Sequence, residues 1–153
     1  MPDNLTCPVP EVFDPQRMTR EEYGRLLNTL LEAERAGAKL LAAYLDELLP
    51  QSGEWDTLSE VQRDEARNCA VLIHLLLDAE AEPTTAIGDF YRKGLAINGW
   101  HERLEFLNRG QSWVAKRIGA ALPRISQAGA RAVLQTMLDS HVANIGICER
   151  LLA

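Results

Sequence analysis

Hydrophobic residues recur along most of this chain at the spacing of an α-helix. Between residues 19 and 49 one stripe carries Tyr23, Leu27, Leu30 and Leu41 at helical intervals. Thr19-Arg20-Glu21-Glu22 reads as a capping box, in which a threonine and a glutamate satisfy the free amides at a helix start. We therefore expect a first long helix from Thr19 to Leu49, ending before Pro50.

The same periodicity predicts three further long helices and one short one. A second capping box, Thr57-Leu58-Ser59-Glu60, opens a helix to about residue 81, after a turn at 51–56. Residues 84–97 form a separate helix of three turns, which Asn98-Gly99 ends. The remaining helices are expected at 100–122 and from about residue 126 to the C-terminus.

No segment of the chain shows the alternating pattern of a β-strand. The fold class is therefore all-α, and the short connections predict an antiparallel four-helix bundle with an extra short helix between its second and third long helices. The 153 residues suit one domain. We place its boundaries at 19–153, preceded by an irregular, proline-rich N-terminal arm at 1–18.

Composition narrows the choice of partners and compartment. The net charge of -6 and pI near 5.1 argue against binding to nucleic acid or to an anionic membrane surface. There is no apolar run long enough to span a bilayer, and residues 1–10 lack the features of a signal peptide. Cys7, Cys69 and Cys148 are odd in number and widely spaced, which indicates reduced thiols in a cytoplasm.

Several polar residues occupy inward positions of the predicted helices, each near the middle of its helix. Burying a carboxylate in an apolar stripe is costly unless it is paired, protonated or bound to a metal. An antiparallel bundle brings helix midpoints to one level, so these groups could converge. Carboxylates mixed with imidazole suit iron or manganese, and also zinc. The candidate metal ligands are Glu34, Glu65, Asn68, Glu105 (with His101 and Asn108 as alternatives on the same helix) and His141.

The chain resembles the ferritin-like superfamily, specifically small bacterial bundle proteins of the rubrerythrin or di-iron-carboxylate type. The segments that carry the resemblance are LLEAERAGA at 30–38, DEARNC at 64–69, FLNRGQSW at 106–113 and MLDSHVANI at 137–145. It implies that Glu34 is the glutamate of the first helix and that Glu65 begins the first Glu-x-x-His pair. Glu105 would be the match on the third long helix, and His141 the second histidine. The implied cofactor is one or two iron, manganese or zinc ions.

Two positions depart from that pattern. Asn68 stands where the first histidine belongs, and Leu138 where the second glutamate belongs. The di-iron ligand set is therefore incomplete, and a bundle that has lost its metal fits the same residues.

Two other interpretations remain open. In one, the chain is a non-catalytic interaction module, whose polar centre is a metal-free hydrogen-bond network to residues such as Arg35, Arg67 or Gln111. A homodimer or partner surface would then come from four aromatic residues: Phe90, Tyr91, Trp100 and Trp113. In the other, weaker one, His74, His101 and His141 form a metal triad like that of the DinB-like hydrolases. No nucleophile–base pair or nucleotide-binding motif is present, so the sequence identifies no substrate.

Overall fold

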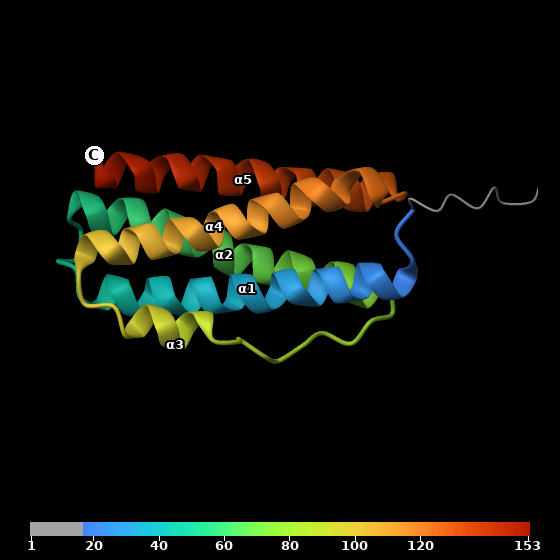
Figure 1. Cartoon of the computed structure of the whole chain (residues 1–153), viewed down its shortest axis with the longest axis horizontal. Coiled ribbons are helices and arrows are strands. Elements are labelled where there is room, and N and C mark those ends of the chain that lie inside the picture. Colours follow the sequence, from blue (N-terminus) through green and yellow to red (C-terminus); the bar gives the residue numbers. More distant parts are fainter. Residues whose placement is uncertain (1–16) are drawn as a thin grey trace, which may run out of the picture.

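The computed structural model describes residues 17–153 and confirms an all-α fold, with no strand in that range. Four long helices lie side by side, and a short fifth helix packs along one flank (Figure 1). The elements are α1 (Arg20–Asp46), α2 (Gly53–Asp78), α3 (Phe90–Leu95), α4 (Trp100–Ala121), the 3₁₀ turn η1 (Leu122–Arg124) and α5 (Ala128–Leu152). Most of the predicted arm at 1–18, including Cys7, lies outside the described residues.

The first residues of α1 and α2 show whether the two predicted capping boxes are formed. At α1 the prediction is confirmed, because Thr19 accepts a hydrogen bond from the Glu22 amide and Glu22 bonds back to the Thr19 amide. At α2 it is wrong: Ser52 is the cap, through a 3.2 Å bond from the Trp55 amide. Thr57 lies inside the helix, where its hydroxyl donates to the carbonyl of Gly53.

Two helices end earlier than expected, and α3 is shorter. α1 stops at Asp46 rather than at residue 49, and α2 stops at Asp78 rather than at 81. Glu80 follows α2 in the left-handed conformation, with φ of 56°, which turns the chain away from the helix axis. α3 covers only six residues of the predicted 84–97, because residues 81–87 are extended.

A long connection determines the topology. α1 and α2 form one antiparallel pair, and α4 and α5 form another (Figure 1). Residues 79–99, here called the crossover segment, return along the whole length of α1 before α4 begins (Figure 1). As a result α2 and α4 run in the same direction, while the pairs in contact, α1 with α4 and α2 with α5, are antiparallel.

Side chains of α1 hold the crossover segment in place. Asn28 donates to the carbonyl of Glu82 at 3.0 Å and accepts from the amide of Thr84 at 2.8 Å. Two turns further along α1, Arg35 donates to the carbonyls of Thr84 and Ala86, at 2.8 and 3.1 Å. These bonds satisfy backbone groups that would otherwise sit in a helix, so the segment stays extended.

The hydrophobic core is divided into two clusters along the helix axes. On α1, Leu27, Leu30 and Leu31 belong to one cluster, and Leu40, Leu41 and Tyr44 to the other. The other long helices show the same division. On α2, Leu72 belongs to the first cluster and Val61 to the second, and on α4 the same holds for Val114 and Leu107. Between the two clusters, all four long helices carry a polar residue. None of the helices within 17–153 is long and apolar enough to cross a membrane.

Candidate ligand-binding site

Each long helix contributes at least one almost fully buried polar side chain to the level between the two clusters. Glu34 comes from α1, Glu65 from α2, Gln111 from α4 and His141 from α5. Their exposed fractions are 1, 6, 2 and 1%. We call these four residues the polar centre.

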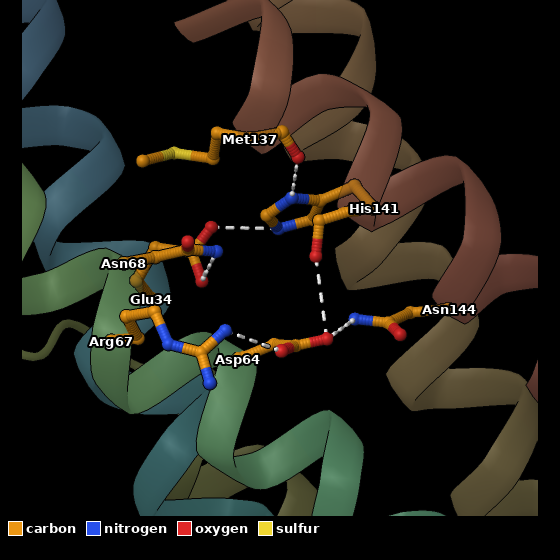
Figure 2. Close-up of polar contacts among 8 residues, drawn as sticks. Glu34, Asp64, Arg67, Asn68, Met137, His141 and Asn144 are labelled. Atoms are coloured by element: carbon orange, nitrogen blue, oxygen red, sulfur yellow. Dashed lines mark hydrogen bonds and ion pairs between the residues drawn. The ribbon is translucent and has the colours of Figure 1, made fainter. Parts of the chain in front are cut away.

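Glu34 and His141 form a buried ion pair that joins α1 to α5. The distance from Glu34 Oε1 to His141 Nε2 is 2.6 Å, and the two side chains face each other in Figure 2. His141 Nδ1 lies 2.9 Å from the carbonyl oxygen of Met137 and must donate to it, which fixes the direction of the ring. Asn68 donates to the other Glu34 oxygen at 3.4 Å. Glu34 Oε2 therefore has a hydrogen bond from Asn68, and Oε1 has the ion pair with His141 but no further hydrogen-bond partner in the described part of the chain.

The environment of His141 favours its charged form. Burial by itself would lower the pKa of this histidine. The hydrogen bond and negative charge of Glu34 outweigh that effect, so the pKa of His141 is raised above its ordinary value. The raised pKa of His141 favours its imidazolium form beside Glu34.

Glu65 and Gln111 form a second pair, but it leaves two oxygens without partners. The Gln111 amide nitrogen donates to Glu65 Oε1. Glu65 Oε2 and Gln111 Oε1 are both buried and have no hydrogen-bond partner among the described residues. Burial, followed by the charge of Glu34, raises the pKa of Glu65 well above its ordinary value.

A glycine on α1 makes room for the Glu65 carboxyl group. A Cβ atom built on Gly37 would lie 2.0 Å from Glu65 Oε2, far closer than atoms can approach. Glycine in a helix interior costs about 1 kcal/mol relative to alanine. The close approach of the carboxyl group to the α1 backbone explains why the helix carries glycine at this position.

A third set of contacts on the flank of the polar centre ties α2 to α5. Asp64 Oδ2 accepts from the Ser140 hydroxyl at 3.3 Å and from the Asn144 amide at 3.4 Å, and Arg67 donates to Oδ1 at 3.1 Å (Figure 2). Sequence analysis missed Asp64. The available signal was Asn144, which stands one turn after His141 on the apolar stripe of α5.

A cavity of about 410 Å³ reaches all four residues of the polar centre. Its remaining walls are mainly apolar, and come from α1, α4, the start of α3 and the crossover segment around Gly88. Gly110 allows this closeness, because a Cβ atom there would lie 2.6 Å from the ring of Phe90. The apolar lining residues are Ala33, Ala36, Ile87, Phe90, Leu107, Trp113 and Val114. We call this cavity the pocket.

The structure brings together four of the five predicted site residues. Glu34, Glu65, Asn68 and His141 are all buried at the centre. Glu105 was expected there and is not: its side chain is 48% exposed and lies 3.1 Å from His101 on the surface. Gln111 takes the inward place on α4 instead.

The histidine triad is not formed. His74 and His101 are exposed, while His141 is buried in the polar centre. The aromatic residues proposed as a partner surface are partly used inside the chain. Phe90 stacks on Phe106 with ring centroids 4.4 Å apart, and only Trp113 is strongly exposed, at 42%.

The expectation of free thiols agrees with the two cysteines that are described. Cys69 and Cys148 are both unpaired. Burial raises the pKa of each to about 11, so neither is an activated thiol.

The arrangement of donors can be compared with what a metal ion requires. Within residues 17–153, no group of three or more histidine, cysteine, aspartate or glutamate side chains is placed so that it could hold a metal ion. His141 is directed at Glu34, and two of the side chains around the carboxylates, Asn68 and Gln111, are amides. The residues present therefore do not fit the metal ions that the family resemblance implies.

Comparison with known proteins gave one match. No curated protein and no solved structure matches this chain. A family described as a domain of unknown function, DUF6306, matches residues 21–150, which cover nearly all of the four long helices and the whole crossover segment. The chain therefore belongs to the DUF6306 family.

Proposed function

We propose that the domain is a ferritin-like four-helix bundle that has a small-molecule pocket in place of a metal centre. The topology supports the first part. Ferritin-like bundles consist of two antiparallel helix pairs joined by one long crossover. The crossover segment joins the α1–α2 pair to the α4–α5 pair in this way (Figure 1).

The second part is carried by one observation: the buried Glu65–Gln111 pair leaves two oxygens without hydrogen-bond partners among residues 17–153. Buried polar atoms nearly always have a hydrogen-bond partner, and an exception calls for an explanation. Glu65 Oε2 and Gln111 Oε1 both belong to residues that border the pocket. Apolar walls with a few convergent polar groups, in a volume of several hundred Å³, are typical of ligand sites. A ligand in the pocket would supply the missing partners.

The two pairs of the polar centre then have different roles. Glu34 and His141 form a buried ion pair, and Asn68 donates to the second oxygen of Glu34, so this pair fixes the positions of α1 and α5. Glu65 and Gln111 retain hydrogen-bonding capacity, so they form the part that contacts a ligand.

A neutral probe tests whether the pocket takes up a small molecule. We expect 2-phenylethanol, which combines an aromatic ring with a single hydroxyl group, to bind the full-length protein with one saturable site in isothermal titration calorimetry. Ala33 lines the pocket, so Ala33→Phe should fill it and abolish binding. Ala42→Phe places the same side chain on an exposed position of α1 and should leave binding unchanged.

Two results of the binding experiment would contradict the proposal. If the alcohol does not bind the wild-type protein, or binds equally well to folded Ala33→Phe, the pocket is not a ligand site. Elemental analysis of protein purified without chelator distinguishes a metal centre from a metal-free ligand site. We expect iron, manganese and zinc each well below one equivalent per chain, whereas a stoichiometric metal would refute the metal-free interpretation.

A further inference from the structure

We propose that the ligand of the pocket is an amine: a small molecule with an ammonium head group at Glu65 and Gln111 and an apolar, aromatic-sized body. This inference rests on the proposed function and names the chemical class of its ligand. It follows from the chemistry of the free atoms, the distribution of charge around them, and the walls of the pocket.

The atoms of the Glu65–Gln111 pair that lack hydrogen-bond partners in the described structure are both oxygens, one from a carboxyl group and one from an amide. The Gln111 side chain donates its nitrogen to the same carboxyl group, and both residues line the pocket. An ammonium group carries three N–H donors and no acceptor, so it can satisfy both oxygens at once. A hydrogen bond between an ammonium and a carboxylate is also among the stronger kinds in proteins.

The distribution of charge at the polar centre also favours an ammonium group as the ligand. Of the two carboxyl groups at the polar centre, Glu34 of α1 already has an ion-pair partner in His141 of α5. Glu65 has only the neutral amide of Gln111 from α4. A cation beside Glu65 Oε2 would favour the ionised carboxylate and offset the cost of burying it.

The outer part of the pocket carries both signs of charge. Glu32 of α1 and Asp89 of the crossover segment contribute carboxylates, and Arg109 of α4 contributes a guanidinium group. Asp89 is paired with Arg92 at 3.3 Å, and the Arg109 guanidinium lies 5.7 Å from the ring centroid of Phe106. Of the described residues, the deepest carboxyl group without an ion-pair partner is therefore Glu65, which directs the ammonium head inward.

The remaining lining suits an apolar body. Phe90, Trp113, Leu107 and Val114 border the pocket, and the ring of Phe90 is held in place by its stack on Phe106. The volume of about 410 Å³ lies within the range of small-molecule sites. A flat ring attached to a short amine-bearing chain would place its ring against these walls and its nitrogen at the polar centre.

The test compares 2-phenylethylamine with 2-phenylethanol, which have almost the same shape and differ in the head group. We expect the amine to bind the full-length protein about tenfold more tightly than the alcohol in calorimetry at neutral pH. Glu65→Gln should bring the two affinities together, because the carboxylate is lost. Glu105→Gln, the same change at an exposed position outside the pocket, should leave the tenfold ratio intact.

Gly37→Ala provides a second variant in case Glu65→Gln does not fold. Its methyl group would displace the carboxyl oxygen that the ammonium requires, so we expect loss of the preference for the amine. The inference is overturned if the wild-type protein binds the alcohol at least as tightly as the amine, or if both variants keep the preference. Failure of the alcohol itself to bind would instead refute the proposed function.

Discussion

The buried pair of Glu34 and His141 offers a quantitative test of how the polar centre is held together. Both side chains are 1% exposed, and Glu34 Oε1 and His141 Nε2 lie 2.6 Å apart. Replacing either one by leucine leaves its partner as a charge inside the protein without compensation. Removing one member of a buried ion pair typically costs about 3–5 kcal/mol. For a chain of this size that corresponds to a fall in melting temperature of roughly 6–20 °C.

The experiment is a double-mutant cycle with Glu34→Leu, His141→Leu and both together. The free energy of unfolding is measured by urea titration at pH 7, with helix content followed by circular dichroism. We expect the double variant to lose at least about 2 kcal/mol less than the sum of the single variants, because no unpaired charge remains.

The chain contains a matched control. Glu105 and His101 have the same residue types at 3.1 Å, but their side chains are 48% and 61% exposed. The same cycle at this surface pair should give a coupling of about 0.5 kcal/mol or less. Additive effects at Glu34 and His141, or single variants that each cost less than about 1 kcal/mol, would refute the assignment of a buried ion pair.

Three further predictions concern other parts of the molecule. The raised pKa of Glu65 means that the folded protein binds the Glu65 proton more tightly than the unfolded chain does. This difference contributes to the free energy of unfolding in full below pH 4.5, the ordinary pKa, and the contribution is lost as pH rises through the pKa of the folded state. Wild-type protein should therefore lose more stability than Glu65→Gln in urea titrations between about pH 5 and about pH 9, and parallel profiles would contradict this. Gly110→Ala should destabilise the protein by about 1–3 kcal/mol, because its Cβ would meet Phe90 at 2.6 Å, and Phe90→Leu should relieve most of that loss; an unchanged urea midpoint would argue against the contact. Cys69 and Cys148, with pKa values of about 11, should react slowly with iodoacetamide at pH 8 in the folded protein and fast in urea, as measured by peptide mass spectrometry; rapid labelling without urea would contradict their burial.

Much of the polar centre could be predicted from the hydrophobic pattern. Glu34, Glu65, Asn68 and His141 each interrupt a clear apolar stripe, so their inward direction follows from helical geometry. The third long helix was harder, because polar residues are interleaved with apolar ones on more than one of its faces. Leu104, Leu107, Gln111 and Val114 share the buried face, and Glu105 lies about 100° away from Leu104 around the helix.

The parts that could not be predicted depend on contacts between distant segments. Residues 81–87 are extended because Asn28 and Arg35 bind their backbone, and no local pattern records this. The pocket exists because Phe90 and the crossover segment cover α1 and α4. Likewise, the glycines at 37 and 110 read as weak points of their helices until the Glu65 carboxyl group and the Phe90 ring are seen against them.

The start of α2 shows a limit of a different kind. Ser52 and Thr57 are both residues that commonly cap helices, and both are followed by acidic residues in the next turn. Thr57 was the stronger sequence match, because Glu60 stands three residues later. The structure starts the helix at Gly53, so Trp55 and Leu58 lie on the helix, with Leu58 in the buried core.

The most direct test of the central claim is a crystal structure of the full-length protein, purified without chelator, with anomalous data collected at the iron and zinc absorption edges. We predict no anomalous peak at the polar centre, His141 Nε2 within hydrogen-bond distance of Glu34, and light-atom density beside Glu65 Oε2 in crystals grown with 2-phenylethylamine. An anomalous peak bonded to Glu34, Glu65 and His141 would contradict the account.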